Sequence, residues 1–134
     1  LNKHSGLIGI SGESSDMREI IAAMKEGHKR SRYAFEVFCY RITKYIGAYA
    51  AAMGGVDALV FTGGIGENSP DVREEVCKSL AFMGIKLDPE KNNNKEEDLS
   101  ADGSTVHVFR IPTNEELVIA LDTEVIVAHH EVDI

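Results

Sequence analysis

The stretch FTGGIGENSP, residues 61–70, places three glycines directly after the apolar run 57–61 and directly before a predicted helix. Glycine at such a junction can adopt a positive φ, and it also lets a ligand approach the bare backbone. The spacing is neither a Walker A loop nor a complete dinucleotide fingerprint. Two interpretations therefore stay open: a tight turn capped by Asn68 or Ser69, or a cradle for a phosphate or purine at a helix N-terminus.

The residues on either side of this stretch predict a strand and a helix. Ala58 to Phe61 is a short apolar run that predicts the strand. Ser69 can cap a helix and Pro70 suits its first position, so residues 71–83 predict the helix. The side chains expected to face inward are Val72, Val76, Leu80 and Met83.

Two helices are predicted before the strand. The cluster Ser14-Ser15-Asp16 offers oxygen acceptors for a helix N-terminus, and Gly27 stops that helix after about Lys25. From Ser31 to Met53 apolar residues recur at helical spacing, which predicts a helix of about 34 Å at 1.5 Å per residue. Its predicted stripe is Phe35, Phe38, Cys39, Ile42, Tyr45, Ile46, Tyr49, Ala50 and Met53.

The remaining sequence predicts two strands and a helix. Residues 85–87 and 105–111 are the predicted strands, and the polar stretch 91–98 between them predicts a surface loop or a frayed helix. The box Thr113-x-x-Glu116 predicts the start of a helix that runs to about Asp122. This order of helices and strands is typical of an α/β layer structure.

Composition favours one ordinary domain. The chain has 134 residues, of which 43% are hydrophobic, and a net charge of −8. Nucleic acid and anionic membrane surfaces are disfavoured as main partners, because both would repel such a chain. No stretch approaches the roughly 20 apolar residues of a membrane span. Cys39 and Cys77 lack the pattern of a disulfide scaffold, so we expect a reducing, cytoplasmic setting. The first residue is leucine, which leaves open a piece of a longer protein or the removal of an initiator or tag.

Two further stretches contain candidate ligand residues. Asp16 could accept a hydrogen bond from a ribose hydroxyl and Arg18 could stack on a purine, although an aspartate at a helix start can also serve the helix dipole alone. After the third strand, the capping box accounts for Thr113 and Glu116 and leaves Glu115 without a structural role. Glu115 could help to hold Mg²⁺ beside nucleotide phosphates, or it could be a solvent-facing acid.

The other reactive groups give little support to metal or covalent chemistry. Cys39 and Cys77 lie in helical patterns without CxxC spacing or a partner base, which disfavours a disulfide, a zinc site and a nucleophile. His129-His130 lies in a tail, 128–134, without a further ligand at metal spacing. The basic cluster at 28–32 is expected to be a solvated connector.

Taken together, three stretches resemble one family. They are SGESSDMREI at 11–20, YRITKYIGAYAAAMGGVDALVFTGGIGENSPDVREEV at 40–76 and IPTNEELVIA at 111–120. In this order and at these separations they closely resemble the C-terminal part of the acetokinase family, the acetate kinases. The resemblance runs from about Ser5 to Ala120, and three motifs in order are far more specific than any one of them.

The resemblance implies a fold and a reaction. Residues 1–127 would form an α/β, ribonuclease H-like nucleotide-binding domain of the actin, Hsp70 and sugar kinase superfamily, with a mixed sheet and flanking helices. Residues 128–134 would be a tail, disordered or artificially added. The family transfers a phosphoryl group reversibly between ATP and acetate, giving ADP and acetyl phosphate, with Mg²⁺. It also implies a homodimer formed largely through C-terminal domains.

The resemblance also assigns residues by motif. Asp16, Met17 and Arg18 would line the adenosine pocket, and Glu115 would be the magnesium-linked carboxylate. The nucleotide loop would consist of Gly64, Ile65, Gly66, Glu67 and Asn68.

The family's N-terminal domain, with its acetate pocket, phosphate loop and catalytic arginine and histidine, has no counterpart in these 134 residues. The resemblance therefore implies no catalytic residue in this chain, and we expect the chain alone to bind nucleotide weakly and to catalyse little. Two alternatives remain. One is a propionate kinase of the same family, and the other is a non-catalytic nucleotide-binding or dimerising module that uses the 31–53 stripe as its interface.

Overall fold

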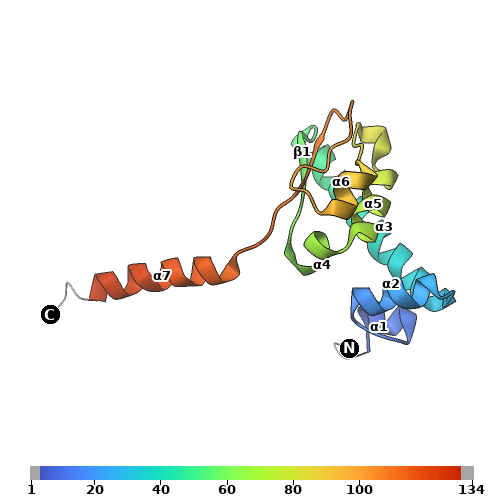
Figure 1. Cartoon of the computed structure of the whole chain (residues 1–134), viewed down its shortest axis with the longest axis horizontal. Helices are drawn as coiled ribbons and strands as arrows, with labels where there is room; N and C mark the ends of the chain where they lie inside the picture. The colour runs from blue at the N-terminus through green and yellow to red at the C-terminus, as the bar shows by residue number, and fades with distance from the viewer. Residues whose placement is uncertain (1–3, 131–134) are drawn as a thin grey trace.

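Helices, several of them ended by glycine or begun by proline, lie beside a small parallel sheet at one edge of the body (Figure 1). The computed structural model describes residues 4–130, without the side chains of Glu115, His129 and His130. The elements follow in the order α1 (Gly6–Ser11), α2 (Met17–Lys25), α3 (Lys29–Met53), β1 (Ala58–Phe61), α4 (Gly63–Asn68), α5 (Pro70–Ser79), the 3-10 helix η1 (Ala81–Met83), α6 (Pro89–Asn94), β2 (His107–Arg110) and α7 (Glu115–His130).

Capping side chains set where the two predicted N-terminal helices begin. The carboxylate of Asp16 accepts a hydrogen bond from a backbone N–H in the first turn of α2. His28 accepts from the N–H of Ser31 and so caps α3, which ends at Gly54 in the left-handed region (φ +77°). Both predicted helices are confirmed.

In the basic cluster at 28–32, Lys29, Arg30 and Arg32 are exposed as expected, but the expectation that it is a connector is wrong. α3 begins at Lys29, so the cluster is its capping residue and first turn. Arg30 from this turn donates to the backbone carbonyl of Ile10 at 2.9 Å, close to the end of α1. α1 itself was not predicted, because its sequence is rich in glycine, which lowers helix propensity.

The sheet consists of β1 and β2, which pair in parallel from Ala58 opposite His107 to Phe61 opposite Arg110. The predicted strand at 85–87 is wrong within the described residues: it makes isolated bridges, parallel at Ile85 and antiparallel at Leu87. The run is too short for a ladder, because the chain already turns into α6 at Asp88. The expected mixed sheet is therefore a small parallel one.

The core lies between α2, α3, α5 and the sheet. The predicted inward side chains Val72, Val76 and Leu80 are at most 1% exposed, and Met83 is half-buried at the edge of the core. The predicted helix 71–83 is divided, with α5 ending at Ser79 and η1 following. Both cysteines are free and buried, and burial raises the pKa of each thiol to about 12.

The polar stretch around 91–98 contains a helix and a buried side chain. Pro89–Asn94 forms α6, capped by Asp88, whose carboxylate accepts from the N–H of Glu90 at 2.8 Å. Asn92 is only 1% exposed, so the expectation of a surface loop or a frayed helix is wrong at this position. The reason is a hydrogen-bond partner for each of its polar groups, described below.

α7 is capped one residue later than predicted. The side chain of Asn114 accepts from the N–H of Leu117 at 3.1 Å and so caps the helix, whereas the hydroxyl of Thr113 donates to Glu67 at 2.8 Å. The predicted capping box is therefore wrong, because its threonine is bonded elsewhere. The helix continues to His130, so residues 128–130 are helical, and residues 131–134 lie outside the described part.

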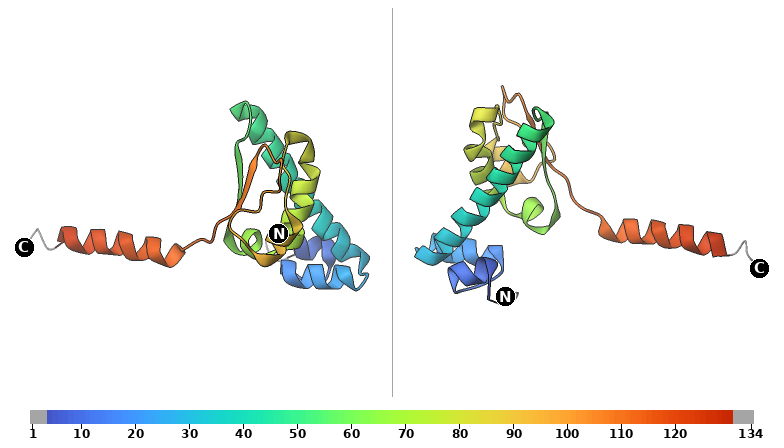
Figure 2. Two further views of the ribbon diagram at one scale, coloured as in Figure 1. Left: turned by 45° about the horizontal axis from the view of Figure 1, so that its top comes forward. Right: turned by 180° about the vertical axis from the view of Figure 1, so that it is seen from behind.

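α7 lies apart from the rest of the molecule in each view (Figures 1 and 2). Its described side chains are exposed, including large apolar ones between 51% and 66% exposed: Leu117, Val118, Ile119, Leu121, Val125, Ile126 and Val127. Between residues 4 and 130, the structure contains no helix that is both long enough and apolar enough to cross a membrane.

Candidate functional site

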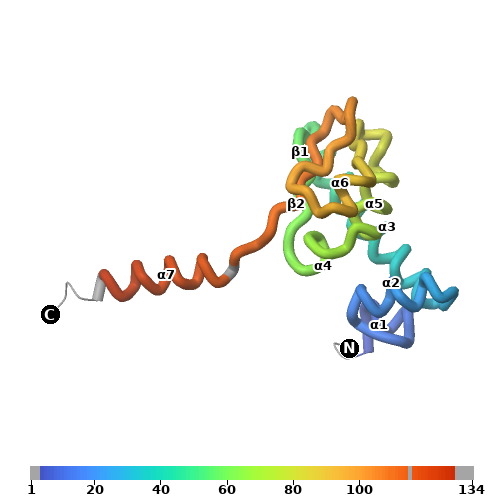
Figure 3. The backbone as a smooth tube through the Cα atoms, in the orientation of Figure 1, coloured from blue at the N-terminus to red at the C-terminus, as the bar shows by residue number. Residues whose placement is uncertain are grey.

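A cavity of about 510 Å³ opens between the start of α2 and the junction of α4 with α5. Figure 3 shows the chain turning from β1 into α4, which lies near α5. Six of the residues predicted to contact nucleotide line this cavity: Asp16, Met17, Arg18, Gly64, Ile65 and Asn68. Its volume falls within the range of small-molecule sites, roughly 300–1,000 Å³.

The first wall of the cavity is the N-terminus of α2. The guanidinium of Arg18 forms an ion pair with Asp16, with an Nε to Oδ1 distance of 3.0 Å, and its side chain is 87% exposed. The hydrogen bond from Arg18 lowers the pKa of Asp16 to about 2. Asp16 therefore caps α2 and also lies on the wall of the cavity, and its contact with a ribose hydroxyl stays a prediction.

The second wall is a short helix rather than the expected loop. Gly63 has φ +71°, which admits the sharp entry from β1 into α4. A Cβ added to Gly64 would meet no atom within 4 Å, so this backbone is open toward the cavity. Asn68 donates from Nδ2 to the carbonyl of Gly64 at 3.0 Å, which holds the far end of α4 against its beginning.

The N-terminus of α5 completes the second wall. Ser69, Pro70 and Asp71 line the cavity, and the hydroxyl of Ser69 accepts from the N–H of Val72 at 3.4 Å. The partial positive charge of a helix N-terminus favours anions. Asp71 also forms an ion pair with Lys25 of α2 at 2.8 Å, which joins the two walls.

Two of the predicted nucleotide residues, Gly66 and Glu67, do not line the cavity. Gly66 packs on β1, since a Cβ there would lie 3.3 Å from the carbonyl carbon of Phe61. Glu67 is bonded within the protein, to the backbone N–H of Gly63 and to Thr113. Both residues therefore contribute to the structure of α4, and the residues of α4 that line the cavity are Gly64, Ile65 and Asn68.

A buried arginine, which the sequence did not single out, donates hydrogen bonds to the backbone of α4. Arg73 of α5 is 0% exposed and donates from Nη1 to the carbonyls of Gly66 (2.8 Å) and Glu67 (2.9 Å). Its Nε and Nη2 donate to the side-chain and backbone oxygens of Asn92, at 2.6 and 3.0 Å. Asn92 in turn donates to the carbonyl of Pro70. The only sequence signal was a charge between the inward positions 72 and 76.

The metal prediction falls on Glu115, whose side chain lies outside the described part of the structure. Its backbone is the first residue of α7, two residues after Thr113. Among the described side chains, no three His, Cys, Asp or Glu come together as a metal site. The role of Glu115 therefore stays a prediction.

Comparisons with known proteins agree on one family. The model of the Acetokinase family matches residues 1–121. An acetate kinase from Treponema denticola is 58% identical over 129 residues, which cover 95% of this chain and 32% of the relative. The crystal structure of Porphyromonas gingivalis acetate kinase matches with a TM-score of 0.84 at 51% identity, covering 94% of this chain and 32% of that one.

A propionate kinase structure from Francisella tularensis matches equally well in shape, with a TM-score of 0.84 at 42% identity, over 90% of this chain and 31% of the other. These matches confirm the predicted α/β fold class. The chain spans about a third of the length of the curated relatives that it matches.

Proposed function

The chain belongs to the acetokinase family, and we propose that it is the nucleotide-binding part of an acetate kinase. In the intact protein, a phosphoryl group would pass reversibly from ATP to acetate, giving ADP and acetyl phosphate. Such transfer depends on positioning and on charge stabilisation around the γ-phosphoryl group. The residues of this chain would bind and orient the adenosine side of the nucleotide.

The observation that carries the proposal is the cavity itself. Two motifs about 50 residues apart in sequence, around Arg18 and around Gly64, come together on its walls. Met17, Ile21 and Ile65 provide an apolar lining for a purine. The exposed guanidinium of Arg18 can stack on its face, and the bare backbone of Gly64 lets a ligand approach closely.

Each part of the nucleotide would meet different chemistry. The carboxylate of Asp16 is ionised at neutral pH and can accept from ribose hydroxyls. The N-terminus of α5 can receive phosphate, although Asp71 in its first turn adds a negative charge that a cation would have to offset. Mg²⁺ would supply that neutralisation, with Glu115 as its proposed carboxylate on this chain.

The chain alone should bind nucleotide weakly and transfer little phosphoryl group, because it spans about a third of its relatives. Titration calorimetry with ATP and Mg²⁺ tests the cavity. We expect saturable binding that Gly64→Val and Arg18→Ala each weaken by about tenfold, which corresponds to about 1.4 kcal/mol. Lys78→Ala, an exposed cation of α5 away from the cavity, is the control and should bind as the wild type does. Unsaturable binding at millimolar nucleotide in the intact protein would reject the proposal.

Acetate is the proposed acceptor, and propionate is the alternative within the family, because a propionate kinase matches this chain in structure. Comparing kcat/KM for acetate and propionate with the intact protein decides between them.

A second proposed role is homodimerisation through α3. Tyr33, Tyr40, Tyr45 and Tyr49 are between 54% and 63% exposed along this helix, and tyrosine is enriched at protein interfaces. The predicted stripe is thus divided, with Phe35 and Cys39 in the core and Tyr45 exposed. Sedimentation equilibrium of wild type and Tyr45→Glu tests this role: a dimer that the charge weakens supports it, and a monomer at all concentrations rejects it.

A further inference from the structure

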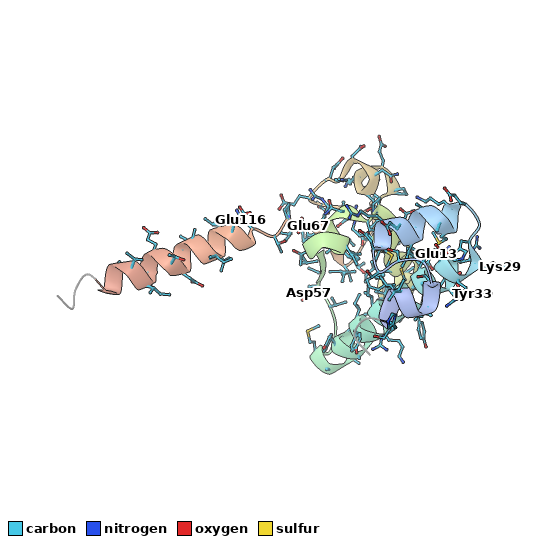
Figure 4. All side chains as sticks on the ribbon, turned by 90° about the horizontal axis from the view of Figure 1, so that it is seen from below. Glu13, Lys29, Tyr33, Asp57, Glu67 and Glu116 are labelled. Atoms are coloured by element: carbon cyan, nitrogen blue, oxygen red, sulfur yellow. The ribbon has the colours of Figure 1, made fainter. Side chains whose placement is uncertain are left out.

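One oxygen of Glu67 receives three hydrogen bonds. Oε1 accepts from the backbone N–H of Gly63 at 2.9 Å, from the N–H of Thr113 at 2.8 Å and from the hydroxyl of Thr113 at 2.8 Å. Thr113 is 46 residues farther along the chain. Figure 4 shows Glu67 on α4 beside the segment that leads into α7, where Glu116 marks the first turn.

The electrostatics of this cluster favour a carboxylate. The hydrogen bonds from Thr113, backbone first and then hydroxyl, lower the pKa of Glu67, and the N–H of Gly63 and the charge of Arg110 lower it further. Hydrogen bonds to an ionised acceptor are stronger than those between neutral groups. Replacing the carboxylate by an amide should therefore weaken all three bonds while keeping the shape of the side chain.

The bonds of Glu67 connect two functional segments. Gly63 begins α4, which carries Gly64, Ile65 and Asn68 to the wall of the cavity. Thr113 precedes α7, whose first residue is the proposed metal ligand. A backbone hydrogen bond from the N–H of Ile111 to the carbonyl of Phe61, at 2.9 Å, joins the same two segments, because Phe61 is the last residue of β1 before α4.

We propose that Glu67 is a positioning residue that fixes the start of α7 relative to the nucleotide cavity, and not a residue that contacts the nucleotide. This inference rests on the proposed function, because it concerns where the proposed metal ligand lies relative to bound ATP. Glu67 does not line the cavity, so its loss should leave nucleotide affinity nearly unchanged. It should instead lower the rate of phosphoryl transfer, because that step needs the nucleotide cavity and the start of α7 in the correct relative position.

The test uses Glu67→Gln and Thr113→Val in the intact protein, with Glu74→Gln, an exposed acid of α5, as the matched control. We expect Glu67→Gln to lower kcat by about tenfold while KM for ATP stays within about twofold. Hydrogen exchange at the Thr113 amide should become at least about tenfold faster in Glu67→Gln. Thr113→Val, which keeps the backbone bond, should shift kcat less and in the same direction.

Other outcomes would overturn the proposal. A raised KM for ATP in Glu67→Gln, with Thr113 exchange unchanged, would make Glu67 a nucleotide contact. Additive rather than overlapping effects of the two substitutions would show that the residues act independently. Failure of the proposed function is distinguishable: a wild type that binds no ATP would reject the cavity, whereas the exchange of Thr113 would still report whether Glu67 holds this segment.

Discussion

The guanidinium of Arg73 is fully buried, and the groups that accept its hydrogen bonds are amide and carbonyl oxygens rather than a carboxylate. Burial lowers its pKa, because desolvation penalises the charged form. The carbonyls of Gly66 and Glu67 lie at the C-terminal end of α4, where the helix dipole favours a cation. Arg73 therefore connects the core to the helix that forms one wall of the cavity.

Removal of Arg73 should destabilise the protein strongly. Arg73→Leu would leave the side chain of Asn92 and two carbonyls without their donor, and each unsatisfied buried group costs about 1–3 kcal/mol. We expect a loss of about 3 kcal/mol or more in the free energy of unfolding, measured by urea denaturation. Lys78→Ala, on the same helix but exposed, should change it by less than about 0.5 kcal/mol. If Arg73→Leu and Lys78→Ala lowered the free energy of unfolding equally, the buried hydrogen bonds of Arg73 would contribute nothing to stability.

The two buried thiols predict a pH dependence. Their pKa values of about 12 lie above the ordinary value, so the unfolded chain releases these protons first as the pH rises. The stabilisation from a protonated thiol is therefore complete below about pH 8.5 and falls as the pH approaches 12, by up to about 1.4 kcal/mol per pH unit and thiol. Urea denaturation at pH 7, 9 and 10 measures it. Cys39→Ala with Cys77→Ala should flatten the slope, and an unchanged slope would assign it to other groups.

At the residue scale, the sequence was most informative where one side chain has one local partner. Asp16 is an example, because its cap involves a residue only two positions away. The bonds of Glu67 to Thr113 and of Arg73 to Asn92 span 46 and 19 residues, and no local pattern encodes them. Thr113 shows the consequence: its capping signal was present, but a distant carboxylate competes for its hydroxyl.

At the scale of the elements, helices α2 and α5 were predictable because capping residues and apolar spacing agree in each. α3 was predicted from apolar spacing alone, since its cap, His28, was not recognised. α4 was not predictable, because three of its six residues are glycine. The tertiary bonds from Arg73 of α5 to the carbonyls of Gly66 and Glu67 offset the low intrinsic helix propensity of the glycines in α4. The cavity was inferred from the resemblance of the motifs, and spacing alone left turn and cradle open.

Two glycines of α4 should respond differently to alanine. Gly66→Ala places a methyl group 3.3 Å from the backbone of β1, so α4 must shift, at a cost of about 1–3 kcal/mol that improved helix propensity offsets only in part. Gly64→Ala meets no atom within 4 Å and should not destabilise the fold, but it adds a methyl group beside the cavity. Thermal unfolding and ATP titration together check this.

Two results would contradict this prediction, one in the melting temperatures and one in the affinity for ATP. If Gly64→Ala lowers the melting temperature more than Gly66→Ala, then α4 does not pack on Phe61 as described. If Gly64→Ala binds ATP with unchanged affinity, the open backbone of Gly64 does not face the ligand.

At the scale of the whole molecule, α7 is the part that packing does not explain. A helix with apolar residues on all sides is typical of one that is buried on every side. Here its large apolar side chains are more than half exposed, and the helix projects from the body (Figure 2). The box Thr113-x-x-Glu116 predicted a helix here, to about Asp122, but no pattern in the chain specifies a surface for it.

The exposed helix should therefore make the 134-residue chain self-associate. Removing residues 115–134 should lower the weight-average mass in sedimentation velocity at about 100 μM and reduce the fluorescence of a dye that binds apolar surface. Leu117→Glu with Leu121→Glu should act in the same direction without shortening the helix, because a charge on an apolar patch opposes burial. Asp122→Ala with Thr123→Ala is the matched control, since it changes exposed polar positions of the same helix and should not reduce association. If truncation leaves the mass unchanged while Tyr45→Glu lowers it, association proceeds through α3 and not through α7.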